Sequence, residues 1–278
     1  MRKESLVSIL RKMRGERQPN MKHIIFYSGG IGSWMTAKRV IEKHGKDNVI
    51  LLFTDTLIED EDLYRFIDET VQEMGVEYVR IEDGRTPWEV FKDVRWLGNS
   101  RLAQCSHHLK QKTADKWIKA NFKPDECVLY LGIDWTEEHR KEKPIKNWSP
   151  YQVEFPMCEE PYLTKEDMLR ELNKLEIETP RLYKLGFSHN NCSGMCVRGG
   201  QGHFVHLLKT FPERFEWMEN YEKEMQEYLG QEVTILKRTK NGVQENLSLK
   251  QLRNEYETKP EQLDLFDIGG CGCFVQND

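Results

Sequence analysis

"IIFYSGGIGSWMTAKRV", residues 24–40, joins an apolar run of strand type to a helical pattern through a turn of serine and glycine. Gly29 and Gly30 let the backbone come close to a ligand, because they carry no side chain. The amides that open the following helix favour an anion, and the hydroxyls of Ser28 and Ser33 can donate to phosphate oxygens. The stretch fits neither the GxxxxGK[ST] nor the GxGxxG pattern. It predicts a phosphate-binding turn, although an ordinary tight strand-to-helix turn would explain it equally well on its own.

The first half of the chain alternates strand and helix. Runs of strand type occupy residues 23–28, 48–56, 76–84 and 126–134, and helical patterns separate them. This alternation predicts an α/β fold, a doubly wound parallel sheet covered by helices on both faces. Ligands of such sheets bind at the carboxyl ends of the strands. The unusual segments of this chain all follow predicted strand ends: residues 28–33, 55–56 and 132–140.

Three regions are expected along the chain. Residues 1–20 are predicted to form an amphipathic helix with a basic face, for which packing on the domain is a simpler explanation than nucleic-acid binding. Residues 21–160 are predicted to form the phosphate-binding domain, which ends in a proline-rich connection. Residues 161–278 are predicted to form a smaller helical and metal-binding region, in which Asn241-Gly242 indicates a hairpin turn.

Composition excludes several classes of protein. The 278 residues carry a net charge of -5, which argues against a strongly basic nucleic-acid coat but not against a local basic groove. No apolar run approaches the roughly 20 residues that span a bilayer, and the N-terminus lacks the apolar core of a secretory signal. The seven cysteines are therefore expected in a reducing, cytoplasmic compartment, where clustered cysteines indicate metal binding or catalysis.

Several further segments extend the interpretation of the turn. The turn itself resembles the SGGxDS pyrophosphate loop of the PP-loop superfamily, the adenine nucleotide α-hydrolases. "LLFTDT" (51–56), "CSHHLKQKTADKWI" (105–118) and "LGIDWTEEHR" (131–140) are similar to segments of its phosphoadenosine phosphosulfate reductase-like branch. The cysteine segments at 183–204 and 269–274 resemble those of phage-encoded relatives. The resemblance covers roughly residues 21–275.

The resemblance implies a site for ATP and magnesium. It implies that Lys110 and Arg140 approach phosphate as catalytic cations and that Glu138 orients Arg140. The remaining nucleotide-binding residues that it implies are Ser28, Gly29, Gly30, Gly32 and Ser33 for the pyrophosphate, Asp55 and Thr56 for adenosine, and Gly132 and Asp134 at the end of the fourth strand.

One position departs from the family pattern. The family loop has aspartate, near the magnesium-bound pyrophosphate, where this chain has Gly32. One carboxylate is therefore missing. Either Asp55 or Asp134 serves the metal instead, or cleavage between the α and β phosphates is weakened.

Two short-spaced cysteine pairs, Cys192 with Cys196 and Cys271 with Cys273, are both flanked by glycine. Four thiolates so placed suit a tetrahedral zinc ion or a [4Fe–4S] cluster, and both remain open. Two unrelated pairs of free thiols are the simpler alternative. Three nearby histidines are expected to pack in the core, although one of them can replace a cysteine as ligand: His189, His203 and His206.

Cys105 begins a predicted helix beside two histidines. A helix N-terminus lowers the pKa of a thiol, which suits a persulfide carrier or nucleophile. The alternative is a small buried residue. A sulfur-donor protein is therefore an expected partner, together with an adenine nucleotide and a nucleotide or nucleic-acid acceptor. A homodimer is compatible with the sequence.

These features predict an adenylating enzyme that releases pyrophosphate from ATP and transfers sulfur to a nucleotide or nucleic acid. A second hypothesis is a reductase of a sulfated adenine nucleotide, which the glycine-packed "GGCGCF" segment disfavours. A third is a nucleotide sensor without catalysis, because of Gly32. A fourth is a zinc-stabilised nucleic-acid-binding protein, whose affinity would ignore ATP and fall steeply with salt.

Overall fold

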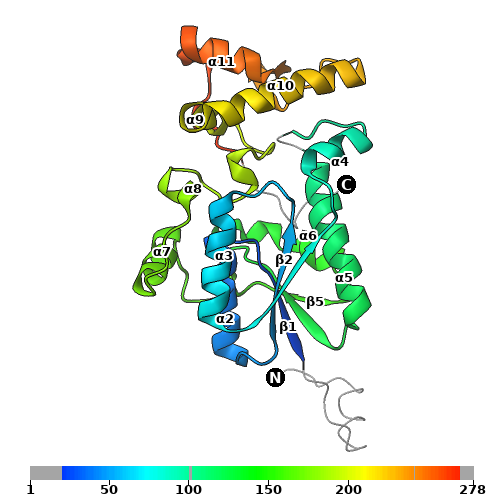
Figure 1. Cartoon of the computed structure of the whole chain (residues 1–278), viewed down its shortest axis with the longest axis vertical. Coiled ribbons are helices and arrows are strands. Elements are labelled where there is room, and N and C mark those ends of the chain that lie inside the picture. Colours follow the sequence, from blue (N-terminus) through cyan, green and yellow to red (C-terminus); the bar gives the residue numbers. More distant parts are fainter. Residues whose placement is uncertain (1–20, 100–101, 241, 270–278) are drawn as a thin grey trace, which may run out of the picture.

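A five-stranded parallel sheet forms the centre of the computed structural model, which describes residues 21–99, 102–240 and 242–269 (Figure 1). The strand order is β3-β2-β1-β4-β5, and every neighbouring pair is parallel. The predicted doubly wound α/β fold is confirmed. The order reverses between β1 and β4, so a crevice opens at the carboxyl ends of these two strands. The strands are β1 (Lys22–Phe26), β2 (Val49–Asp55), β3 (Glu77–Glu82), β4 (Cys127–Tyr130) and β5 (Gln152–Glu154).

β5 is the one strand of the sheet that the sequence analysis missed. It is three residues long and lies in the proline-rich stretch interpreted as a connection. Its side chains are exposed or half-buried, so it carries no apolar run that would mark it as a strand. The predicted N-terminal helix, residues 1–20, lies outside the described residues.

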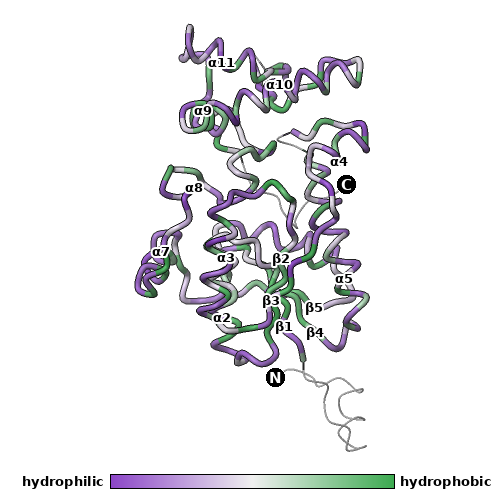
Figure 2. Tube along the Cα trace, viewed as in Figure 1, coloured by the Kyte–Doolittle hydropathy of each residue, from purple (hydrophilic) through white to green (hydrophobic). Residues whose placement is uncertain are grey.

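Apolar side chains alternate between the two faces of the sheet, as the pleat of a strand requires. Ile25 and Phe53 belong to a cluster on one face that also contains residues of α2, α3 and α7. Ile24 and Leu52 belong to a cluster on the other face, with residues of α5. Figure 2 shows the hydrophobic strands enclosed by more polar helices. Because α7 contributes Met168 to the first cluster, the core of the sheet extends past residue 160.

The helices around the sheet begin and end near the predicted signals. Gly45 ends α2, Gly75 ends α3 in the left-handed conformation, and Thr164 begins α7 with a capping box to Asp167. The elements are α2 (Ile31–His44), α3 (Glu61–Met74), α4 (Pro87–Asp93), the π-helix η1 (Ser106–Lys112), α5 (Thr113–Asn121), the 3-10 turn η2 (Trp135–Arg140), α6 (Glu142–Asn147), η3 (Pro156–Cys158), α7 (Lys165–Lys174) and α8 (Arg181–Lys184).

The C-terminal region and residues of α4 form a third apolar cluster, and α9, α10 and α11 lie at one end of the molecule in Figure 1. β6 and β7 form an antiparallel hairpin, as the sequence predicts, and helices lie on both sides of Pro212. No helix among the described residues is long and apolar enough to cross a membrane. The elements are η4 (Cys192–Gly194), α9 (Gln201–Thr210), α10 (Pro212–Leu229), β6 (Leu236–Lys240), β7 (Val243–Leu247), α11 (Leu249–Thr258) and η5 (Pro260–Gln262).

Candidate functional site

The serine-glycine turn between β1 and α2 is closed by one hydroxyl group. The Ser33 oxygen accepts hydrogen bonds from the Ser28 amide and the Ser28 hydroxyl, both at 3.2 Å. The Ser33 hydroxyl in turn donates to the Gly30 carbonyl at 2.9 Å. These bonds hold the turn in a ring at the N-terminus of α2. The first amides of that helix therefore face the crevice, with the positive end of the helix dipole behind them.

Two glycines are required for this geometry. Gly29 has φ +72, and a Cβ there would lie 2.9 Å from Cγ of Leu63. A Cβ on Gly132 would lie 3.2 Å from the Gly32 carbonyl carbon and the Ser33 amide nitrogen. The turn and the end of β4 thus approach each other backbone to backbone. Gly32 itself is different, because its added Cβ would only contact the Gly132 carbonyl at an ordinary 3.5 Å.

A cavity of about 250 Å³ lies at the carboxyl ends of β1 and β4, where the strand order reverses. Its lining combines the turn, the segment after β4 and three cationic side chains, which is a suitable environment for a polyanion. The predicted site residues that the structure brings together there are Ser28, Gly30, Gly32, Ser33, Lys110, Gly132, Asp134 and Arg140.

Arg140 lines this cavity, but Glu138 is not its partner. The Arg140 guanidinium pairs with Glu137, which lies three residues earlier and also lines the cavity. Glu138 instead accepts from Lys141 at 2.8 Å and points to solvent. The prediction for Glu138 is therefore wrong, because the 3-10 turn brings each residue beside the one three positions later.

Lys110 reaches the cavity from the π-helix η1 and is almost completely buried. Its ammonium lies 3.7 Å from a carboxylate oxygen of Glu59, whose side chain is 1% exposed. The same carboxylate accepts the Thr56 hydroxyl at 2.9 Å and the amide of Cys192. The Lys110 charge is thus partly balanced, and its carboxylate partner links β2 to the cysteine segment.

Asp55, Thr56 and Cys105 do not line the cavity. The Asp55 carboxylate folds back onto β3, where it pairs with Arg80 at 2.6 Å and accepts from Tyr64 at 3.0 Å. β2 lies one strand away from the crevice, which explains why its end residues miss it. Cys105 packs against the apolar cluster of the C-terminal region.

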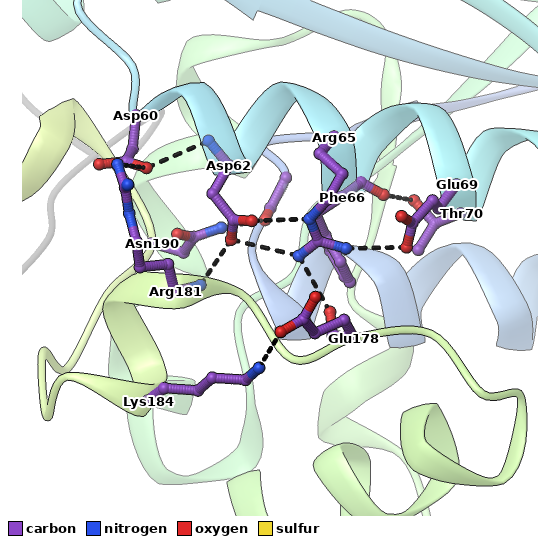
Figure 3. Close-up of polar contacts among 11 residues, drawn as sticks. Asp60, Asp62, Arg65, Phe66, Glu69, Thr70, Glu178, Arg181, Lys184 and Asn190 are labelled. Atoms are coloured by element: carbon purple, nitrogen blue, oxygen red, sulfur yellow. Dashed lines mark hydrogen bonds and ion pairs between the residues drawn. The ribbon is translucent and has the colours of Figure 1, made fainter.

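Seven residues of the cavity lining come from the region beyond residue 160: Lys165, Met168, Tyr183, Ser188, His189, Asn190 and Asn191. The sequence analysis singled out only His189 and missed the other six. Neither their residue types nor their spacing form a recognisable motif. They reach the cavity because α7, α8 and the loop after α8 return to the sheet. The fully buried Asp60 carboxylate helps to hold this region against α3 (Figure 3). It forms an ion pair of 2.6 Å with Arg181 and a second ion pair of 3.0 Å with Arg214.

A larger groove, of about 750 Å³, lies between α6 and the η1–α5 segment. Its lysines include Lys112, Lys143 and Lys146, but Asp115 and Glu142 also line it. It contains no glycine turn and no part of the strand ends. We therefore assign the candidate site to the smaller cavity, where backbone donors and cations converge.

Cys192 and Cys196 lie next to each other in a strained turn. Cys192, Ser193 and Gly194 have φ of 51, 52 and 78, although only the last is glycine. A hydrogen bond with Cys196, burial and the nearby Glu59 carboxylate raise the pKa of the Cys192 thiol well above its ordinary value. This raised pKa favours the protonated Cys192 thiol, and a metal ion that binds it would displace the proton.

Of the three histidines expected to pack in the core, His203 does so, His206 is half-buried, and His189 is exposed, so the prediction is wrong for His189. His203 donates from Nε2 to the Gly194 carbonyl at 2.7 Å, and burial lowers its pKa to about 4. His206 Nε2 lies 2.7 Å from the Leu185 carbonyl. His189 lines the cavity.

Cys271 and Cys273 lie outside the described residues. Gly269, the last residue before them that is described, packs on Arg198–Gly200, where an added Cβ would overlap the backbone. Asp267 also accepts from the Gly202 amide at 2.8 Å. Residues 267–269, which precede the second cysteine pair in the sequence, therefore pack against residues 198–202, which follow the first pair. No group of three or more potential metal ligands occurs within residues 21–99, 102–240 and 242–269.

Comparison with known proteins gives a distant similarity only. No protein-family model and no curated protein sequence matches the chain. Among solved structures, it is similar to a U34-tRNA thiolase from Methanococcus maripaludis with its [4Fe–4S] cluster (17% identity, 78% and 77% of the two chains covered, TM-score 0.45). It is also similar to a phosphoadenylyl-sulfate reductase from Candida auris (15%, 67% and 95%, TM-score 0.42) and an NH3-dependent NAD synthetase from Campylobacter jejuni (11%, 80% and 89%, TM-score 0.38).

Proposed function

We propose that the chain is an ATP-binding enzyme of the PP-loop type, in the branch similar to phosphoadenosine phosphosulfate reductases. The observation that carries this proposal is the cavity at the reversal of strand order, where the turn of residues 28–33 meets Lys110 and Arg140. Helix amides, glycine backbone and buried cations are the groups that bind polyphosphate. The sequence resemblance of residues 51–56, 105–118 and 131–140 supports the same assignment.

In the proposed reaction, an oxygen of the substrate attacks the α-phosphorus of ATP. The bond to the β-phosphate breaks, and pyrophosphate leaves with the bonding electron pair. The adenylated substrate is then open to displacement of AMP by a sulfur nucleophile. The protein's contribution is charge placement: the amides at the start of α2, Lys110 and Arg140 stabilise the negative charge that moves onto the leaving pyrophosphate.

The metal site is part of the same proposal. Cys192 and Cys196 would supply two thiolates of a four-cysteine site, and Cys271 and Cys273 the other two. The strain at Cys192 and Ser193 is typical of segments held for function. A zinc ion would make the site structural, whereas a [4Fe–4S] cluster would favour sulfur transfer to a nucleotide or nucleic acid. Cys105 remains a candidate sulfur carrier, although it packs away from the cavity lining.

Measurement of the pyrophosphate released from ATP in the presence of magnesium distinguishes an enzyme from a sensor that binds the nucleotide without catalysis. We expect slow release by the wild-type protein and faster release by Gly32→Asp, because the site has room for the Cβ and the aspartate restores a magnesium ligand. Gly32→Asn is the matched control, since it has similar size without the charge. Binding of ATP with no release by either protein would favour the sensor, and loss of activity in Gly32→Asp would mean that the backbone there requires glycine.

A further inference from the structure

One lysine of the cavity, Lys165, has its direct contacts with neutral groups. The Lys165 ammonium donates to the Ser188 carbonyl at 3.1 Å and lies 4.0 Å from the centre of the Tyr183 ring. Both contacts are with neutral groups, and no carboxylate of the described residues forms an ion pair with it. Lys110 and Arg140, in contrast, each pair with a glutamate. A half-buried ammonium whose direct contacts are neutral favours the binding of an anion.

The Tyr183 hydroxyl is hydrogen-bonded to the first backbone amide of helix α2, directly after the phosphate turn. It accepts a hydrogen bond from the Ile31 amide at 3.2 Å, and Ile31 is the first residue of the 14-residue helix α2. A Cβ added to Gly30 would lie 3.4 Å from this hydroxyl, so the hydroxyl lies directly against the turn. A phosphate oxygen accepts at such a helix terminus. The hydroxyl therefore stands where an anionic oxygen would bind.

Asn190 gives an independent indication of a ligand. Its side chain is 3% exposed, lines the cavity and donates from Nδ2 to the Gly29 carbonyl at 3.0 Å. Its Oδ1 is buried and has no hydrogen-bond partner among the described residues. A buried amide oxygen without a donor is unfavourable. The bound water of a magnesium–polyphosphate complex would supply the missing donor.

We propose that Lys165 and Tyr183 form a subsite for the terminal phosphate of a nucleoside triphosphate. A phosphate oxygen replaces the Tyr183 hydroxyl on the Ile31 amide, and Lys165 supplies the counter-charge. The Tyr183 hydroxyl therefore marks the position that a phosphate oxygen would take. The inference rests on the proposed nucleotide function, and it adds residues that no feature of the sequence indicated.

Calorimetric titration with inorganic pyrophosphate, ATP and AMP, all with magnesium, tests this subsite. We expect Lys165→Met to weaken pyrophosphate and ATP binding roughly 10- to 100-fold, as loss of a hydrogen bond to a charged group does. AMP lacks a terminal phosphate, so its affinity should change less than about twofold. Tyr183→Phe removes the competing hydroxyl but keeps the ring beneath Lys165, and should strengthen pyrophosphate binding roughly 2- to 10-fold.

Lys184→Met is the matched control, because that ammonium pairs with Glu178 outside the cavity. It should bind all three probes like the wild type, and melting curves would show whether each variant is folded. Wild-type affinity in folded Lys165→Met, or weaker pyrophosphate binding in Tyr183→Phe, would overturn the subsite while the nucleotide function stands. A wild-type protein that binds neither ATP nor AMP would overturn the proposed function itself.

Discussion

Replacement of Lys110 by methionine is expected to destabilise the fold by about 3–5 kcal/mol, the usual cost of removing one partner from a buried ion pair. The Glu59 carboxylate, 1% exposed, would keep the hydrogen bonds from the Thr56 hydroxyl and the Cys192 amide but lose its contact with the Lys110 ammonium. Urea denaturation followed by circular dichroism measures the free energy of unfolding. The double variant Lys110→Met/Glu59→Gln should recover most of the loss, because it removes both charges.

Lys112→Met provides the control for this prediction. Lys112 ends the same π-helix, is exposed and lines the larger groove rather than the cavity. Its replacement should change stability by less than about 0.5 kcal/mol, as is usual for surface positions. Equal, small effects at both positions would mean that Lys110 and Glu59 are solvated and do not form the buried pair that links β2 to the cysteine segment.

The second large effect concerns the metal. Metal analysis and a visible spectrum of anaerobically purified protein should show either about one zinc or roughly four irons with a broad band near 400 nm. The Cys196→Ser variant should lose nearly all of the bound metal, because a four-thiolate site rarely keeps its metal with three thiolates and a hydroxyl. Metal-free protein, or full occupancy in Cys196→Ser, would contradict the four-cysteine site.

Cys158→Ser is the matched control for the metal experiment. Its thiol donates to the Ile133 carbonyl at 3.3 Å, a bond that a serine hydroxyl can keep. Cys158 lies in η3, after β5, and packs against the apolar cluster that contains residues of α5. The metal content of this variant should therefore equal that of the wild type.

Four of the five strands and the turn between β1 and α2 could be predicted because each rests on a local pattern, whereas the strand order could not. Apolar runs of β1, β2 and β4 are long and bounded by glycine or charge, and every unusual segment follows a strand end. The contacts of Asp55 could not be predicted, for a reason that is not local. It lies at a strand end as expected, but its strand is one position away from the reversal, and Arg80 on β3 holds its carboxylate.

Lys165, Tyr183 and Asn190 could not be predicted from the sequence, because tertiary packing brings them to the cavity. Their segment returns to the sheet through α7, which shares the core of α2, and through the buried Asp60. A lysine at the start of a helix and a tyrosine in a short helix are common on any surface. The contact of Tyr183 with Ile31 distinguishes these residues from ordinary surface residues, and it joins two positions that are 152 residues apart in the sequence.

Amide hydrogen exchange of residues 28–36 with and without ATP and magnesium tests the central claim most directly. The first amides of α2 have no intrahelical acceptor, so a bound polyphosphate should slow their exchange. We predict strong protection of this segment by ATP and by inorganic pyrophosphate, and little by adenosine. Unchanged exchange at residues 28–36, with protection confined to the groove between α5 and α6, would contradict the assignment of the nucleotide to the turn.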